Sequence, residues 1–100
     1  MFVIIISYKK SLEMVDKYIE EHREFLDNCY RKNYFIASGP KNPRTGGVII
    51  SQLSDRGSLE EILVSDPFSI YDIADYEIVE FLPTKYHAAF STFLELNKDG

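Results

Sequence analysis

One stretch of the chain, residues 15–30, constrains the fold more than any other. Its apolar side chains recur every three or four positions, with charged residues between them, which is the pattern of an amphipathic helix. The recurring positions are Val15, Tyr18, Ile19, His22, Phe25, Leu26, Cys29 and Tyr30. Ser11 suits the N-cap of this helix, and Asn33 suits a left-handed closing position. Such a helix buries one face, so the rest of the chain has to supply the layer that covers it.

Four other segments have the composition of strands. Residues 2–8, 34–38, 48–53 and 76–82 are rich in β-branched and aromatic side chains, and they are too short for independent helices. Glycine and proline at positions 39 and 40 predict the end of the second strand, and residues 41–47 predict a loop. The second and third strands should then form a hairpin with a long, mobile tip.

A short helix is expected between the third and fourth strands. Ser58 and Glu61 have the spacing of a capping box, so this helix should open at Ser58. It should end near Asp66, because Pro67 disfavours helical geometry in the residue before it. Residues 68–73 fit a further helical turn.

The predicted elements follow the order β-α-β-β-α-β, which is the ferredoxin-like arrangement. We therefore expect an α+β fold in which an antiparallel sheet carries its helices on one face. This domain should span residues 1–83. Residues 84–100 should form a C-terminal extension, in which residues 87–96 fit a terminal helix.

The two inner strands of the predicted sheet are apolar on both faces. Residues 2–6 and 48–50 show no alternation between apolar and polar side chains. A bare sheet face of this kind would form a large exposed apolar patch. We expect a second copy of the chain to cover it, giving a homodimer through the sheet face. In the alternative, the C-terminal segment folds back over the same face.

Charge and composition argue against several classes of function. The chain has 100 residues and a formal net charge of −5, which repels a phosphate backbone, so no nucleic-acid partner is expected. No apolar run approaches the roughly 20 residues that span a bilayer, and the apolar N-terminus lacks the basic residues of a signal peptide. Cys29 is the single cysteine, and no zinc-type spacing surrounds it. We expect a cytoplasmic protein with no membrane partner and no metal.

His22 is the most informative residue for chemistry, because it lies on the apolar stripe of the long helix. An imidazole in that position needs a hydrogen-bond partner or a cavity. It is either a structural histidine bonded to a backbone carbonyl or an acid–base residue in a pocket between helix and sheet. Asp66 is the natural partner, since a carboxylate fixes the tautomer of the ring and stabilises the imidazolium. Asp66 also suits simple turn chemistry, with its carboxylate bound to local backbone donors.

Four short features, in this order, resemble the YCII-related (YciI-like) domain family over residues 1–83. They are His22 on the first long helix, Ser38-Gly39-Pro40 after the second strand, Asp66-Pro67-Phe68, and a strand that ends in Phe81-Leu82-Pro83. This family is a ferredoxin-like member of the dimeric α/β-barrel superfamily. The resemblance therefore implies a dimer in which each subunit has a His–Asp active site, and it places those roles on His22 and Asp66.

The same resemblance implies a class of reaction. Relatives with assigned chemistry handle small, often aromatic or lactone-like molecules by proton abstraction with elimination or isomerisation, without a metal or organic cofactor. This sequence departs from many relatives at two places. Asn33 stands where they have glycine before the second strand, and residues 69–72 lack a glycine found after Asp-Pro-Phe. The second departure bears on the shape of the pocket and on the substrate.

Three further residues are candidates for substrate binding. Ser38 either holds a ligand oxygen or simply ends its strand, and Arg44 and Lys41 either attract an anionic substrate or are solvated loop charges. Cys29 fits a buried core thiol. A metal site could be assembled only from His22, Asp66 and His87, and these three residues match no recognisable metal-binding motif. No metal site is therefore expected.

The sequence thus predicts two classes of function. The first is a cofactor-free acid–base enzyme of lyase or isomerase type, which uses His22 and Asp66 on a small organic molecule. The second is a non-catalytic homodimeric module that binds a small molecule or another protein. The enzyme hypothesis requires the two side chains to meet beside a pocket that solvent can enter.

Overall fold

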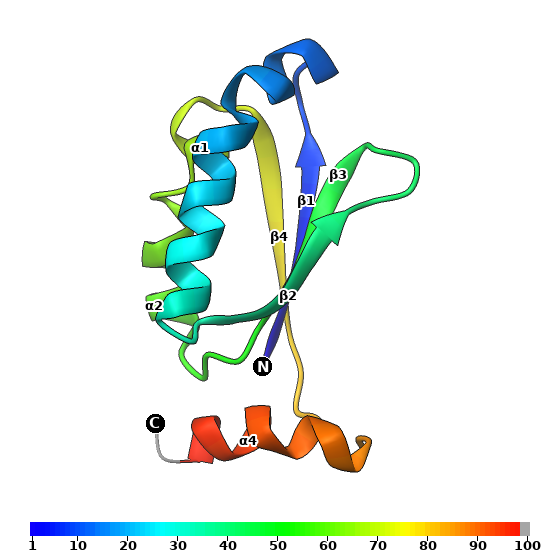
Figure 1. The fold of residues 1–100 in the computed structure, drawn as a ribbon, viewed down its shortest axis with the longest axis vertical. Helices are drawn as coiled ribbons and strands as arrows, with labels where there is room; N and C mark the ends of the chain where they lie inside the picture. The colour runs from blue at the N-terminus through cyan, green and yellow to red at the C-terminus, as the bar shows by residue number, and fades with distance from the viewer. Residues whose placement is uncertain (99–100) are drawn as a thin grey trace.

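A computed structural model describes residues 1–98 and shows an antiparallel sheet with helices packed on one of its faces (Figure 1). The strands are β1 (Phe2–Tyr8), β2 (Phe35–Pro40), β3 (Gly46–Ser51) and β4 (Ala74–Glu80), in the spatial order β2-β3-β1-β4. The helices are α1 (Leu12–Arg31), α2 (Arg56–Leu63), α3 (Pro67–Ile70) and α4 (Ser91–Lys98), with a 3₁₀ turn η1 (Ala88–Phe90). The predicted α+β ferredoxin-like fold is confirmed.

Helix α1 forms as its sequence pattern predicts. The Ser11 hydroxyl accepts a hydrogen bond from the backbone N–H of Met14 at 3.3 Å, which caps the first turn. Asn33 follows the last turn with φ 61°, the left-handed value expected there. Val15, His22 and Cys29 are the buried residues of this helix. The remaining residues of the stripe pack partly buried against the core.

Strand β1 lies in the middle of the sheet and divides the molecule into two faces. Phe2 and Ile4 are fully buried under the helices, with Ile6 nearly so. Val3 and Ile5 point to the opposite face, because side chains alternate along a strand. The register pairs Val3 with Ile50 and with Val79, so these three side chains share that open face. The predicted two-sided apolar character of the inner strands is therefore present.

Strand β2 extends further than the sequence predicted, since Gly39 and Pro40 pair with β3 instead of ending the strand. The reason is position: β2 is an edge strand, where a proline without an N–H costs no ladder hydrogen bond. The register shifts between Phe35 and Ala37. This irregularity resets the alternation, so Ser38 stands opposite the buried Ile49 on the helix side of the sheet.

Strand β3 starts two residues earlier than predicted, at Gly46, and ends at Ser51. A Cβ atom at Gly46 would lie 1.8 Å from the backbone oxygen of Ile6. Only glycine permits β1 and β3 to approach so closely at this point. The loop before Gly46 is consequently shorter than expected, residues 41–45.

The prediction for the start of α2 is wrong. The helix begins at Arg56, and its N-cap is Asp55, whose carboxylate accepts hydrogen bonds from the Ser58 N–H at 2.9 Å and from the Ser58 hydroxyl at 2.7 Å. A carboxylate is a stronger acceptor than a hydroxyl at a helix N-terminus, so it displaces Ser58 from the cap. Asp66 instead caps the short helix α3 with Pro67 in its first turn.

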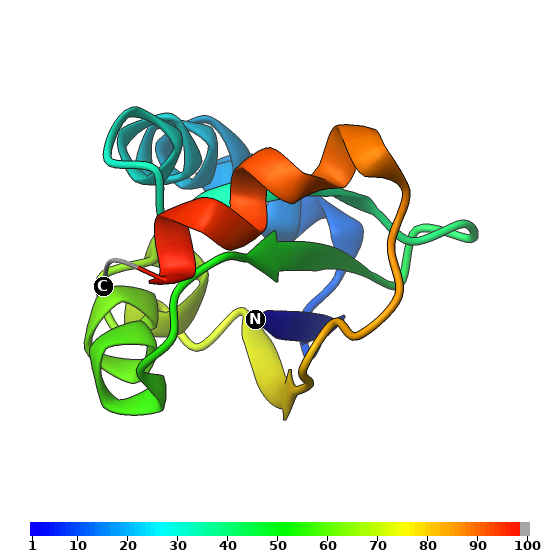
Figure 2. The same cartoon turned by 90° about the horizontal axis from the view of Figure 1, so that it is seen from below.

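Strand β4 runs from Ala74 to Glu80 instead of over the predicted residues 76–82, and the chain then continues into η1 and α4. Helix α4 lies across the ends of the strands and does not lie flat over the open face of the sheet (Figures 1 and 2). Within residues 1–98, no helix is both long and apolar enough to cross a membrane.

Candidate active site

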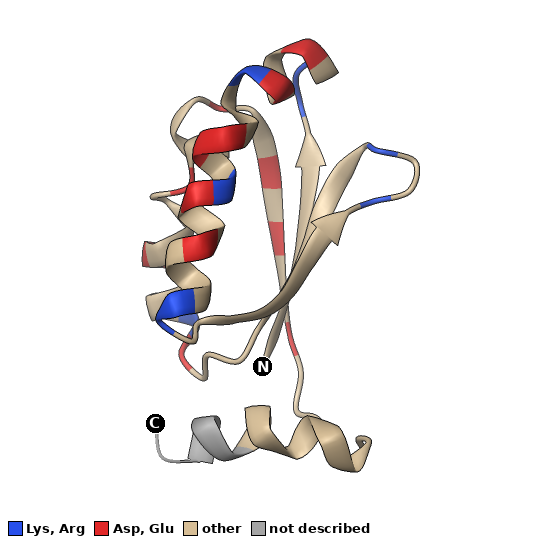
Figure 3. Cartoon of the chain, viewed as in Figure 1, with Lys and Arg blue, Asp and Glu red and all other residues tan. Residues whose placement is uncertain are grey.

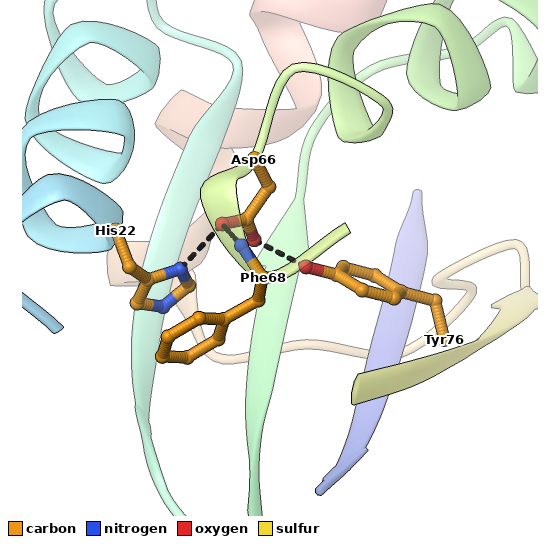
Figure 4. Close-up of polar contacts among 4 residues, drawn as sticks. All are labelled: His22, Asp66, Phe68 and Tyr76. Carbon is orange, nitrogen blue, oxygen red and sulfur yellow. Dashed lines mark hydrogen bonds and ion pairs between the residues drawn. The ribbon is translucent and has the colours of Figure 1, made fainter. Parts of the chain in front are cut away.

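The structure brings His22 and Asp66 together from separate parts of the chain. The imidazole Nδ1 of His22 lies 2.8 Å from the Oδ1 atom of Asp66. Asp66 is 0% exposed and His22 is 8% exposed. Helix α1 presents the ring from its buried face, and the Asp-Pro corner at the start of α3 presents the carboxylate (Figure 4). The contact that the enzyme hypothesis requires is therefore present, and it forms a buried ion pair when the ring is protonated.

Three donors converge on the Asp66 carboxylate. Besides His22, the backbone N–H of Phe68 donates to Oδ1 at 3.0 Å, and the hydroxyl of Tyr76 donates to Oδ2. Burial, followed by the charge and hydrogen bond of Asp66, raises the pKa of Tyr76 far above its ordinary value of 10.0. The phenol therefore stays protonated and keeps its role as donor. Both carboxylate oxygens are thus held in place by hydrogen bonds.

Sequence reasoning missed Tyr76. The signal was present, because Tyr76 occupies a position of β4 on the same face as the buried Ala74. A buried tyrosine needs a partner for its hydroxyl, but nothing in the sequence indicated that β4 would run beside the Asp-Pro corner. That adjacency comes from the sheet order, in which β4 flanks β1.

The orientation of the His22 ring follows from its contacts. An ionised carboxylate has no proton to donate, so Nδ1 carries the proton and donates it to Asp66. The ring also stacks on Phe68, with centroids 4.0 Å apart and planes 6° apart (Figure 4). Stacking and hydrogen bond together restrict rotation of the imidazole. The second nitrogen, Nε2, is the one left to exchange a proton.

A pocket of about 380 Å³ lies between α1 and the sheet, and His22 forms part of its wall. Its lining is completed by apolar side chains, by backbone of β2 and β3, and by a few polar groups. The side chains include Ile6, Tyr8, Asp16, Ile19, Arg23, Leu26, Ser38, Arg44 and Phe68. Asp66 does not line this pocket, because it lies behind the imidazole and is fully buried.

Ser38 lines the pocket and bonds to a neighbouring side chain. Its Oγ lies 2.6 Å from the hydroxyl oxygen of Tyr30 on α1. The hydroxyl is therefore oriented toward the helix layer, and this position depends on the strand irregularity before Ala37. A serine hydroxyl has one donor and two acceptor sites, so the bond to Tyr30 leaves capacity for a ligand.

Arg44 also lines the pocket, and its guanidinium is paired. Its Nη2 lies 2.6 Å from the Oδ1 of Asp16 on α1, so the loop and the helix are linked across the pocket. The hydrogen bond to Asp16 holds the pKa of Arg44 above its ordinary value, with a smaller contribution from Tyr8. Lys41, the other basic residue of this loop, donates to the Ser7 hydroxyl at 3.1 Å and does not line the pocket.

The structure does not bring His87 into a shared site with His22 and Asp66. Its Nδ1 accepts a hydrogen bond from the Ala89 N–H at 3.1 Å, so His87 caps the turn η1. Across the described part of the chain, no three side chains of His, Cys, Asp or Glu are grouped so that they could hold a metal ion.

Cys29 is a buried thiol, 4% exposed, as the helix pattern predicted. Burial, with a contribution from the charge of Asp66, raises the pKa of this thiol from 9.0 to about 11. Between pH 9.0 and about pH 11, the Cys29 thiol loses its proton in the unfolded chain and keeps it in the folded chain. The free energy of unfolding therefore falls as the pH rises through this range.

We expect this loss of stability at alkaline pH to be smaller in Cys29→Ala, measured by urea unfolding from about pH 8 upward. Equal losses in both proteins would contradict the prediction.

Comparison with known proteins gives a family, and it shows that the fold occurs among solved structures. The YCII-related domain family matches residues 1–82. The fold is similar to 5-chloro-2-hydroxyhydroquinone dehydrochlorinase from Burkholderia phenoliruptrix AC1100, solved in complex with 2,5-dihydroxybenzoquinone. The two chains are 16% identical, and the TM-score is 0.68 over 82% of this chain and 94% of that chain. At this identity the likeness shows a shared fold. No curated protein sequence matches the chain.

Proposed function

Because this chain belongs to the YCII-related domain family, we propose that it is a cofactor-free acid–base enzyme acting on a small organic molecule. One observation carries the proposal: the ring of His22 is bonded to a buried carboxylate through Nδ1 and lines a pocket of about 380 Å³. A ring held in one tautomer beside a pocket is suited to proton transfer. The reaction class we propose is that of a lyase or an isomerase.

His22 and Asp66 have distinct roles in this proposal. The Nε2 lone pair of His22 takes a proton from a substrate carbon, and the Asp66 carboxylate stabilises the imidazolium that results. The electron pair left on the carbon then forms a double bond as a leaving group departs, or the proton returns to another carbon. Tyr76 and the Phe68 N–H keep the carboxylate in position during the transfer.

We propose Ser38 and Arg44 as the groups that bind the substrate. Both line the pocket, from β2 and from the loop that follows it. The Arg44 guanidinium has five N–H donors, so donors remain for a substrate oxygen beside the bond to Asp16. Ser38 supplies a further donor or acceptor on the same side of the sheet.

The similar solved structure supports this reaction class. Its name describes a dehydrochlorinase of a small ring compound, and loss of hydrogen chloride includes removal of a proton. A test that assumes no particular substrate is a panel of small carbon acids, incubated in D₂O and followed by ¹H NMR. Catalysed exchange or elimination supports the enzyme. Saturable binding with no exchange or product across the panel would support the non-catalytic binding module instead.

We also propose that the chain forms a homodimer through the open face of the sheet. Val3, Ile5, Ile50 and Val79 share that face, and Val79 is 42% exposed in the single chain. Helix α4 lies across the ends of the strands, and no helix of residues 1–98 lies flat over this face (Figure 2). Burial of such a patch against a second copy is favourable.

The dimer is tested by light scattering at micromolar concentration. We expect twice the chain mass for the native protein and a shift toward the monomer for Ile5→Glu, because a buried charge on an apolar interface is costly. Val64→Glu is the matched control, since Val64 is 64% exposed on α2's C-cap, away from the sheet. A monomer mass for the native chain would refute the proposal.

A further inference from the structure

Arg23 lines the pocket and has no role in the function proposed above. It follows His22 on α1, and its side chain is exposed to solvent. Within the described residues, the ion pairs and hydrogen bonds include none to Arg23. This contrasts with Arg44, whose guanidinium is already paired with Asp16 at 2.6 Å.

The charges of the pocket wall show why it matters that Arg23 is unpaired and Arg44 is paired. Three ionised side chains line the pocket: Asp16, Arg23 and Arg44. Two positive charges and one negative charge give the wall a net charge of +1, on a chain whose formal net charge is −5. Because Arg44 and Asp16 neutralise each other, the positive charge that a ligand meets belongs to Arg23. Figure 3 shows that most charged residues of α1 are acidic, so Arg23 is a basic residue on a mainly acidic helix.

The rest of the pocket suits the carbon part of a ligand. Ile6, Leu26 and Phe68 line it together with Tyr8, so apolar and aromatic surfaces face the interior. A volume of about 380 Å³ accepts a molecule with a single ring. The wall therefore combines one unpaired cation with apolar surface beside the imidazole of His22.

We propose that Arg23 is the specificity-determining residue of this site and that it selects small organic acids by binding their carboxylate. A guanidinium matches a carboxylate with two parallel N–H donors, which gives both affinity and orientation. Since Arg23 and His22 line the same pocket, an acid held at Arg23 keeps its carbon skeleton next to the imidazole. The assignment of a substrate class rests on the proposed acid–base function, whereas the binding of the acid does not.

The test is an NMR titration with benzoate, benzamide and inorganic phosphate. The backbone amides of Gly39 and Gly47 report on the pocket, because both residues line it. Benzoate should shift these two signals saturably, and its neutral isostere benzamide should bind at least about tenfold more weakly, as loss of a charge-assisted hydrogen bond predicts. Arg23→Gln should weaken benzoate binding by a similar factor.

Lys10→Gln is the matched control, because it removes the same charge from an exposed residue outside the pocket. Its Kd for benzoate should stay within about twofold of the wild type. The inference is overturned if benzoate and benzamide bind equally, if benzoate shifts neither signal, if phosphate binds in place of benzoate, or if Lys10→Gln and Arg23→Gln weaken binding equally. Benzoate binding that depends on Arg23, together with no exchange or product from any compound of the carbon-acid panel, would refute the enzyme and uphold this inference.

Discussion

Replacing Asp66 with alanine is expected to destabilise the protein more than any other change to the site. Asp66 is 0% exposed and accepts hydrogen bonds from His22, from the Phe68 N–H and from Tyr76. Asp66→Ala leaves all three donors without this acceptor, and each unsatisfied buried donor costs about 1–3 kcal/mol. We therefore expect a loss of at least about 3 kcal/mol in the free energy of unfolding, a large part of the stability of a small domain.

Urea unfolding at neutral pH measures this loss. Asp27→Ala is the matched control, because Asp27 is exposed on α1 and outside the pocket wall, and surface substitutions change stability by about 0.5 kcal/mol or less. Equal unfolding midpoints for the two variants would mean that the carboxylate does not hold the corner between α1, α3 and β4.

His22→Gln is expected to have the largest effect on turnover. The glutamine amide retains a donor for Asp66 but cannot take up a proton at neutral pH. Loss of a positioned general base lowers the rate by about 10²- to 10⁴-fold. The measurement is the exchange or elimination rate, by NMR in D₂O, of whichever compound the wild-type protein turns over.

The chain provides its own control for that substitution. His87 is the second histidine, it lies outside the pocket wall, and it caps a short turn in the C-terminal extension. His87→Gln should leave the rate within about twofold of the wild type, since a change remote from the reacting atoms affects the barrier little. If His22→Gln is as active as His87→Gln, the imidazole of His22 is not the base.

Much of the fold was predictable because it depends on local patterns. The stripe on α1 is periodic over five turns, and its cap at Ser11 and its closing residue Asn33 are local choices of backbone geometry. The order of helices and strands along the chain followed from these patterns, and it predicted the ferredoxin-like fold. Strand ends were predicted less well: Gly39 and Pro40 suggested a turn, but pairing with β3 at the sheet edge extended the strand through both residues.

The candidate site was predictable only in part. His22 stood out because a polar ring on an apolar stripe needs a hydrogen-bond partner, and the Asp-Pro corner contains a carboxylate that could be that partner. Tyr76 and Arg23 did not stand out, because a tyrosine in a strand and an arginine on a charged helix face are ordinary. What makes them notable is which groups lie beside them: the buried Asp66 for Tyr76, and a partly apolar pocket for Arg23.

The helix and strand types, and the choice of His22 as the candidate for chemistry, could be read from local patterns, since helix periodicity and an imidazole on a buried face are properties of neighbours along the chain. Three features became visible only in the folded chain: which donors bind each oxygen of Asp66, which arginine is paired with Asp16, and that Ser38 faces the helices. These features depend on contacts between residues far apart in sequence. Such contacts are fixed by strand register and by packing across the sheet, which local patterns do not specify.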